Sequence, residues 1–169
     1  MPGFDYSQIP GEKLVEVFSR SLTTIDGLWF LAIEQKYGFD AAMEMDIEVW
    51  RRFSSIHGRR VIRTFTIKED TPVRTLIKLV QADPLMAVQK PEVVTLTDDK
   101  AIFRCMDCPT QVARIKDGKG VFPGQPVCQA MYTAYAEAID PRIKITCLAS
   151  PPDTENVPYW CEWQFEIPD

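Results

Sequence analysis

Histidine is nearly absent from this chain, which has one imidazole, His57, among 169 residues. A lone histidine gives little basis for a triad of the serine-protease type, in which the imidazole acts between a serine and a carboxylate. Two glycine motifs are also missing. Without GxGxxG we expect no self-contained dinucleotide site, and without GxxxxGK[ST] we expect no phosphate-binding loop of that type.

Long runs of one kind of residue are missing as well. The net charge is −5, and basic residues form only local pairs such as Arg59-Arg60, which are typical of a solvated helix face. We therefore expect no nucleic-acid partner. No window holds the roughly 20 apolar residues of a membrane span, so we expect no membrane partner. The first residues lack the basic start and apolar core of a signal peptide, which predicts a cytoplasmic protein with reduced thiols.

Cysteine is absent from the first hundred residues and frequent after them. All five cysteines lie between Arg104 and Phe165, and they are Cys105, Cys108, Cys128, Cys147 and Cys161. An odd number of cysteines argues against a disulfide framework. A chain of this length also needs no disulfide to fold, because it can bury about 70% of its unfolded surface. We interpret the crowding as a sulfur-lined site assembled from segments that are distant in sequence.

Three of the cysteines fall in segments with the alternating pattern of strands. In each segment the cysteine shares the apolar face, so Cys105, Cys147 and Cys161 should point inward. An inward cysteine can act simply as a small hydrophobic residue. Packing and a functional role therefore both stay open for these three thiols.

The other two cysteines have more specific contexts. Cys128 follows Gly124-Gln125-Pro126, a helix start with proline at the first helical position. In the first turn, free N–H groups and the helix dipole favour a thiolate, which predicts that Cys128 is the most reactive thiol. Cys105 and Cys108 have the CxxC spacing with which two thiolates reach one metal ion, although no second CxxC completes a standard zinc motif.

Helical and strand patterns are separated along the chain. Apolar residues at helical spacing dominate the first half, whereas alternation and a hairpin dominate the second. The predicted fold class is α+β, with N-terminal helices packed on an antiparallel sheet formed mainly by the C-terminal half. We predict one domain over residues 1–169, with a mainly helical part at 1–88 and a cysteine-containing sheet part at 89–169. The predicted helices are 12–37, 40–57, 72–82 and 127–139, and the predicted strands are 92–97, 101–106, 143–148 and 159–167.

Asp26 is unusual because apolar residues fan out on both sides of it within the first predicted helix. A bare charge is costly to bury, so this carboxyl must be capped, paired or protonated. Thr23, Thr24 and Gly27 weaken the helix here, and a break would let Asp26 cap the helix that follows. The alternative is a carboxylate at the floor of a pocket.

Several motifs together resemble an uncharacterised bacterial and archaeal family. They are Ile25-Asp26-Gly27-Leu28-Trp29-Phe30, Ile139-Asp140-Pro141-Arg142-Ile143 and Trp160-Cys161-Glu162-Trp163-Gln164-Phe165. More distantly, the order Cys108-Pro109, Cys128, Asp140-Pro141 and Cys161 is similar to that of L-2-amino-thiazoline-4-carboxylic acid hydrolases. The C-terminal pattern is also similar to the 4-vinyl reductase domain family, whose members bind small ligands and in some cases a cysteine-bound zinc. Ser150 stands where relatives are expected to carry a further cysteine.

These resemblances imply different functions, and whether the chain is an enzyme stays open. The first hypothesis is a small-molecule-binding domain of the 4-vinyl reductase type, with a zinc site formed by Cys108, Cys128, Cys147 and Cys161. The second is a hydrolase that cleaves a C–N bond of a heterocycle or amide. Its nucleophile would be Cys128, with Asp26 or Glu34 as acid or base. The third is a subunit that works through partner contacts, with a homodimer as the assembly to test.

Overall fold

Helices occupy the first half of the chain, as the sequence predicts. The computed structural model, which describes residues 3–168, begins with a 3-10 turn, η1 (Tyr6–Gln8). Two helices of 27 residues follow, α1 (Gly11–Tyr37) and α2 (Phe39–Phe65). Between them Gly38 has a φ of 92°, a conformation that favours glycine, and the chain reverses there. Two shorter helices, α3 (Pro72–Ala82) and α4 (Pro84–Ala87), complete this half.

The first helix is continuous through Asp26, so the capping interpretation of that residue is wrong. The hydroxyl of Thr23 donates to the carbonyl of Ser19 at 2.9 Å, and that of Thr24 donates to Arg20 at 2.8 Å. These bonds satisfy the polar side chains inside the helix and remove the local reason for a break. The second helix passes Gly58, where the sequence allowed either an end or an extension over residues 59–67, and continues to Phe65.

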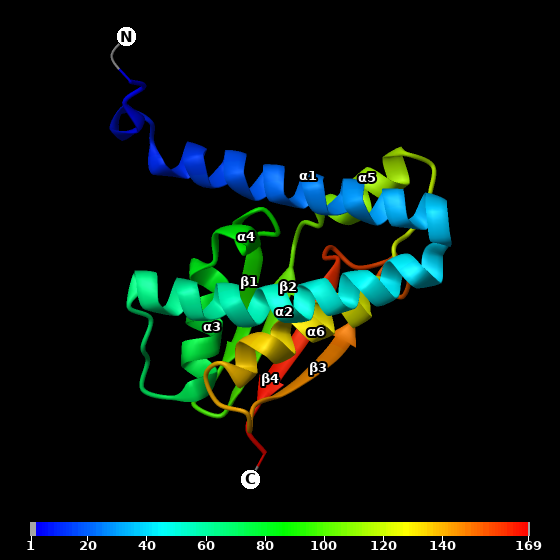
Figure 1. The fold of residues 1–169 in the computed structure, drawn as a ribbon. Coiled ribbons are helices and arrows are strands. Elements are labelled where there is room, and N and C mark those ends of the chain that lie inside the picture. Colours follow the sequence, from blue (N-terminus) through cyan, green and yellow to red (C-terminus); the bar gives the residue numbers. More distant parts are fainter. Residues whose placement is uncertain (1–2, 169) are drawn as a thin grey trace.

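The second half contains an antiparallel sheet, which confirms the α+β class. Its strands are β1 (Pro91–Leu96), β2 (Lys100–Cys105), β3 (Lys144–Ala149) and β4 (Cys161–Glu166). Their order is β1-β2-β4-β3, and every neighbouring pair is antiparallel. The last strand along the chain therefore lies inside the sheet, between β2 and β3 (Figure 1).

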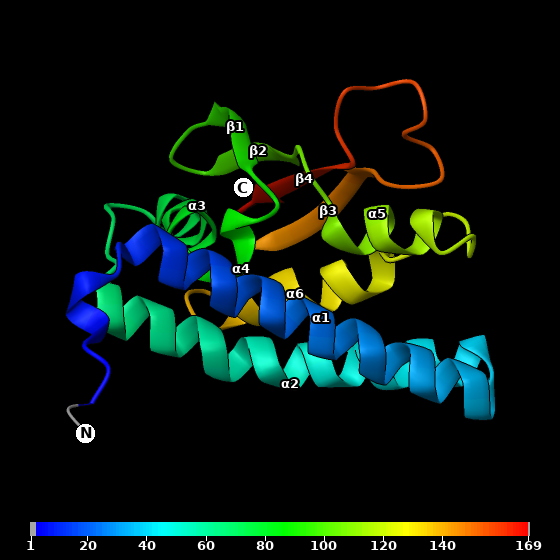
Figure 2. The ribbon, with the colours of Figure 1, turned by 90° about the horizontal axis from the view of Figure 1, so that it is seen from above.

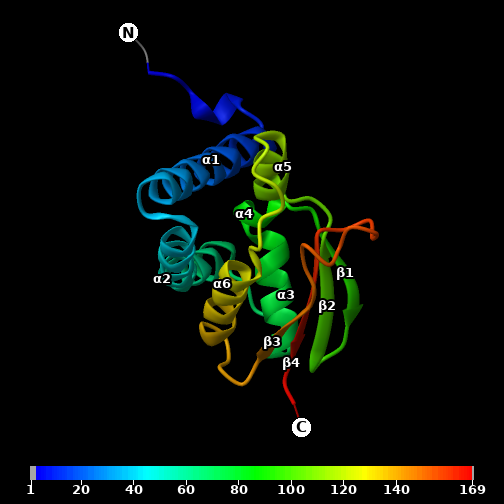
Figure 3. The same ribbon diagram turned by 90° about the vertical axis from the view of Figure 1, so that its right-hand side faces the viewer.

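Two helices interrupt the strands of the second half. The predicted helix is present as α6 (Gln125–Glu137), whereas α5 (Pro109–Lys116) has no counterpart in the prediction. Figure 3 shows α3 and α6 between the sheet and the long helices, with α2 packed on α6 and α1 farther out. Figure 2 shows α5 on the same side of the sheet as α1, above the first turn of α6. One face of the sheet is thus covered by helices.

The core lies where α3 and α6 meet this covered face. Phe103 of β2, Tyr132 of α6 and Trp163 and Phe165 of β4 are fully buried, with ring centroids 5.0 to 5.5 Å apart in the contacting pairs. Edge and tilted contacts of this kind add to the stabilisation from burial. Phe103 and Trp163 are register partners in the sheet, so the strand pairing itself places the aromatic residues together.

A buried polar network joins three helices beneath this core. Asp83, at the end of α3, is 1% exposed. Its carboxylate accepts hydrogen bonds from the Tyr135 hydroxyl at 2.6 Å and the Leu85 backbone N–H at 2.9 Å. His57 Nε2 of α2 lies 2.9 Å from the same carboxylate, and its ring stacks on Phe53. The single histidine is therefore a core residue fixed by Asp83.

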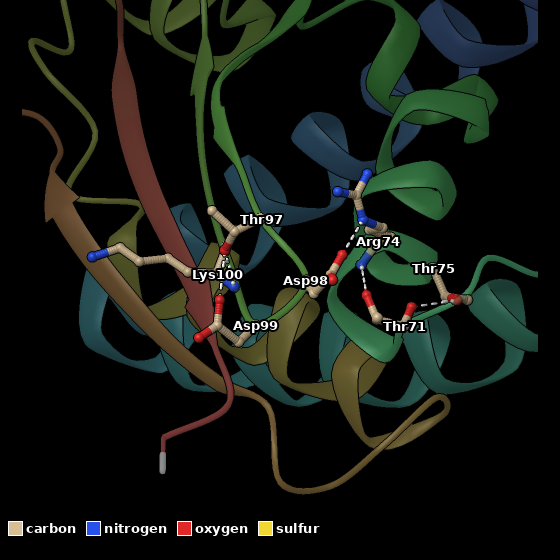
Figure 4. A network of polar contacts seen from close by, with 7 residues as sticks. All are labelled: Thr71, Arg74, Thr75, Thr97, Asp98, Asp99 and Lys100. Atoms are coloured by element: carbon tan, nitrogen blue, oxygen red, sulfur yellow. Dashed lines mark hydrogen bonds and ion pairs between the residues drawn. The ribbon is translucent and has the colours of Figure 1, made fainter.

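A second, exposed network fixes the start of α3 against the β1–β2 turn (Figure 4). Arg74 Nε donates to Asp98 at 2.7 Å, and the turn is closed by a bond from the Lys100 backbone N–H to the Thr97 hydroxyl. Thr71 caps the helix by accepting from the Arg74 backbone N–H. Because Asp98 is largely solvated and Arg74 partly so, this ion pair should stabilise the fold by less than about 1 kcal/mol.

Candidate functional site

A cavity of about 520 Å³ lies between the long helices and the sheet. Its walls come from α1, α2, α5, the first turn of α6 and the adjoining ends of β2 and β4. Most of its lining is apolar, and the polar groups are concentrated in a few side chains. A volume of this size is typical of sites for small organic ligands.

Four of the five cysteines line this cavity. Cys105 and Cys161 are register partners at the paired ends of β2 and β4. Cys108 precedes α5, and Cys128 lies in the first turn of α6. The fifth, Cys147, is not part of the lining, but it is close enough to Cys128 to affect its ionisation. The fold thus gathers the segments that the sequence analysis expected to meet.

Cys128 is not the thiol that ionises most readily. Burial is the largest of the effects that raise its pKa, and the neighbouring thiols, Cys161 first, raise it further. Desolvation here opposes the stabilisation that a first turn gives to a thiolate, so the predicted reactivity of Cys128 stays a prediction. Burial also raises the pKa of Cys108, to about 11.

Cys161 has the opposite shift. Its pKa is lowered chiefly by a hydrogen bond with the Cys105 thiol, and further by the Trp163 indole and the Cys105 backbone N–H, against the effect of burial. Trp163 is fully buried, and its Nε1 has no hydrogen-bond partner of normal geometry. This N–H therefore acts on Cys161 at a geometry outside that of a normal hydrogen bond. Cys161 is the strongest candidate for a reactive thiol.

The four predicted metal ligands do not form a ready metal site. Within residues 3–168, no group of three or more histidine, cysteine, aspartate or glutamate side chains is arranged to hold a metal ion. A tetrahedral thiolate site has metal–sulfur distances of about 2.3 Å, so the four sulfur atoms would have to move closer to one another to bind zinc. The zinc site of Cys108, Cys128, Cys147 and Cys161 stays a prediction.

The helical end of the cavity contains two carboxyl groups. Asp26 of α1 and Asp46 of α2 both line it, and the Trp50 indole N–H donates to Asp26 at 3.1 Å. Burial raises the pKa of Asp26 to about 6, although the bond from Trp50 opposes the shift. Burial and the nearby Asp26 raise the pKa of Asp46 to about 7, so the pair retains protons near neutral pH.

The pairing of these residues could have been found from the sequence. Asp26 and Trp50 are each twelve residues from Gly38, where the chain reverses. Residues equidistant from such a turn lie side by side in antiparallel helices. Asp46 is one helical turn before Trp50 and so shares its face. The sequence analysis did not include Asp46 in the site.

Glu34 lies outside the cavity lining. Its carboxylate is bound by Arg114 at 3.2 Å and by Lys119 at 3.3 Å. The bond with Arg114 is the largest of the effects that lower its pKa. Arg114 does line the cavity, and its guanidinium lies over the Phe30 ring at 5.5 Å and the Phe122 ring at 5.4 Å. Glu34 thus positions an arginine at the wall.

Changing Asp46 to asparagine should alter how stability depends on pH. Its folded pKa of about 7 lies above the ordinary aspartate value, so the folded state holds a proton that the unfolded state releases as pH rises from about 4 to 7. Wild-type stability should fall through this window. The asparagine variant lacks this loss. From about pH 4 to about pH 8, its free energy of unfolding should therefore increase relative to that of wild type by on the order of 2 kcal/mol, after allowing for solvent screening.

Urea unfolding of both proteins at the two pH values checks this expectation. Glu44→Gln is the matched control, because Glu44 is an exposed residue of the same helix outside the cavity. An Asp46→Asn difference that does not change with pH would show that the carboxyl is not protonated in the folded protein.

The fold and the cavity together define a small α+β domain with a ligand-sized pocket lined by thiols and carboxyls. The chain belongs to the family described as "Family of unknown function (DUF6125)", whose model matches residues 8–167. No curated protein and no solved structure matches the chain. In the part of the chain that the structure describes, residues 3–168, no helix combines the length and apolar character needed to cross a membrane.

Proposed function

We propose that this chain is a small-molecule-binding domain whose ligand occupies the cavity between α1, α2 and the thiol-lined ends of β2 and β4. The observation that carries the proposal is the cavity itself, about 520 Å³ with a mainly apolar wall and a few convergent polar groups. The similarity to 4-vinyl reductase domains points to the same class of function.

Filling the cavity from Gly27 should weaken ligand binding without weakening the fold. Gly27 lines the cavity in the middle of α1, and a Cβ added there meets no atom within 4 Å. A Gly27→Phe side chain would therefore enter open space, while the loss of a mid-helix glycine favours the helix. We expect binding of the neutral apolar dye Nile red to weaken by about tenfold or more, because the ring occupies the volume that a ligand needs.

The matched control is Gly11→Phe at the start of the same helix. Gly11 also has open space around its added Cβ but lies outside the cavity lining. Fluorescence titration should give equal dye affinity for this variant and wild type. Equal affinity for Gly27→Phe as well would place the dye elsewhere and contradict the proposal.

A zinc ion bound by Cys108, Cys128, Cys147 and Cys161 is the proposed cofactor of this domain. The support is chemical, since four thiols of this region influence one another's ionisation and soft thiolates favour zinc. Elemental analysis of purified protein should then give one zinc per chain, reduced by Cys161→Ser. Protein that binds the dye but contains no zinc would remove the metal from the proposal.

Hydrolysis of a small C–N bond is a second candidate function. It is favoured by the presence of thiols and the Asp26 carboxyl, whose pKa is about 6, in one cavity. A thiolate could attack the carbon, and a protonated Asp26 could donate to the leaving nitrogen. The pKa directions favour Cys161 over Cys128 as that nucleophile.

Assembly into a homodimer is proposed as well. The outer side of α1 exposes several large apolar side chains, namely Val17, Phe18, Ile25, Leu28 and Trp29. Apolar patches on exposed helices often mark contact surfaces, and a second copy of the chain could pack there. Trp50 and Phe53 contribute instead to the interior, where their rings contact at 5.5 Å.

A further inference from the structure

The two carboxyls of the cavity lack a basic partner. Within residues 3–168 neither Asp26 nor Asp46 takes part in an ion pair, and the hydrogen bond from Trp50 is neutral. The cavity lining contains two arginines, and neither binds these carboxyls: Arg20 binds Glu16 at 3.0 Å, and Arg114 binds Glu34 through its terminal nitrogens, while its buried Nε has no partner. The acidic charge at the helical end is therefore not compensated by the protein.

A buried donor marks the other end of the same cavity. Trp163 is fully buried and lines the cavity, and its Nε1–H, which acts on Cys161, has no partner of normal geometry. Buried N–H groups are rarely left unsatisfied in proteins, so such a group commonly awaits a ligand or water. The cavity thus offers acceptors at the helices, a donor at the sheet and an apolar wall between them.

We propose that the cavity selects a compact, mainly apolar organic cation, a protonated amine or amidinium, whose positive group binds between Asp26 and Asp46. This inference rests on the proposed small-molecule function and specifies its ligand class. A cation would ionise both carboxyls and supply the missing partner, whereas a neutral ligand would leave them as they are. An anion would meet two carboxyls that already repel each other.

Binding of a cation should be coupled to proton release from this pair. Because the two pKa values are about 6 and about 7, affinity should rise as pH increases through that window. Other groups that line the cavity could also respond to pH. From α1, the α5 region, α6 and the two strands these are Arg20, Cys105, Cys108, Arg114, Asp117, Cys128 and Cys161. The pKa values of Cys105, Cys108 and Cys128 are raised, which keeps these thiols neutral between about pH 5 and 8. The pKa of Cys161 is lowered, so a negative charge on this thiol at the upper end of the range would act in the same direction as the carboxyl pair.

Three probes of nearly equal shape test the inference: benzamidine, benzamide and benzoate, which are a cation, a neutral molecule and an anion. Each is titrated into the full chain by calorimetry at about pH 8 and pH 5.5, on either side of the two carboxyl pKa values. We expect benzamidine to bind about ten- to a hundredfold more tightly than benzamide at the higher pH, the range for a charged hydrogen bond, and benzoate more weakly than either. The preference should shrink at the lower pH.

Variants assign the preference to the two carboxyls. Asp26→Asn with Asp46→Asn should remove the preference for benzamidine over benzamide, because both negative charges are lost while the shape of the site is kept. Glu44→Gln, which removes an exposed charge from the same helix, should leave the preference intact.

Two outcomes overturn the inference, and they separate it from the proposed function. Equal affinity for benzamidine and benzamide would show that the site ignores charge while still binding small molecules. Failure of all three probes also overturns it, and Nile red then decides the broader question. Continued dye binding that is sensitive to Gly27→Phe keeps the small-molecule function, whereas its absence removes both.

Discussion

Replacing Asp83 with alanine should lower the free energy of unfolding by about 3–5 kcal/mol, the cost of breaking a buried charged network. The carboxylate is 1% exposed and accepts from the Tyr135 hydroxyl and the Leu85 backbone N–H, with His57 Nε2 at 2.9 Å. Removing it leaves a fully buried tyrosine hydroxyl without a partner and also removes the cap of α4. The network fixes α2 and α6, the helices that carry Asp46 and Cys128, so the cavity should lose its shape as well.

Urea unfolding measures this loss, and Asp98→Ala is the control. Asp98 also forms an ion pair, with Arg74 at 2.7 Å, but its side chain is 75% exposed (Figure 4). Its removal should cost less than about 1 kcal/mol. Tyr135→Phe, which deletes only one bond of the network, should fall between the two variants. A loss for Asp83→Ala no larger than that for Asp98→Ala would mean that the network does not hold the helices together.

Iodoacetamide should modify Cys161 before the other thiols of metal-free protein. The pKa of Cys161 lies below the ordinary value of 9.0, whereas that of Cys108 is about 11. At about pH 8 the thiolate fraction of Cys161 should then exceed that of Cys108. A thiolate of lower pKa is also a weaker nucleophile, so the advantage in labelling rate should be smaller than the difference in thiolate fraction. Peptide mass analysis after brief exposure identifies the modified residue.

The neighbour that lowers the pKa of Cys161 provides the test of cause. Cys105→Ala removes the thiol that stabilises the Cys161 thiolate, and labelling should slow. Cys147→Ala removes a thiol outside the cavity lining and should leave the rate nearly unchanged. Earlier labelling of Cys128 would restore the helix-start argument and contradict the effect of burial.

Much of the fold could be predicted from local signals. Gly38 ends one helix, and Thr71 with Pro72 starts another. Both signals can be found in the sequence because they depend on the local backbone geometry of these residues. Alternation in β2 and β4 placed Phe103, Trp163 and Phe165 on the covered face, where they are fully buried. Helix α5 was missed because it has only eight residues and a weak apolar pattern.

The site was harder to predict because its properties depend on neighbours from other elements. The first-turn position of Cys128 favours a thiolate by at most about 2 kcal/mol, and the sequence does not show that distant segments would bury it. The lowered pKa of Cys161 depends on a cross-strand partner, which only the register of β2 and β4 reveals. For Asp26 the pocket carboxyl was the alternative interpretation, and Asp26 does line the cavity. The predicted break in the helix is wrong, because the hydroxyls of Thr23 and Thr24 donate to backbone carbonyls within a continuous helix.

The central position of β4 has a consequence for how the protein is made. The ribosome synthesises β1, β2 and β3 first. In the finished sheet β2 and β3 each pair with β4, so neither strand has its partner on that edge until β4 has been made. Such long-range pairing is slow, and the waiting strand edges are open to wrong partners. A nascent chain that ends before Cys161 also lacks the sheet-side wall of the cavity. The ligand should therefore bind only after synthesis of this segment, and could then favour the completed sheet by mass action.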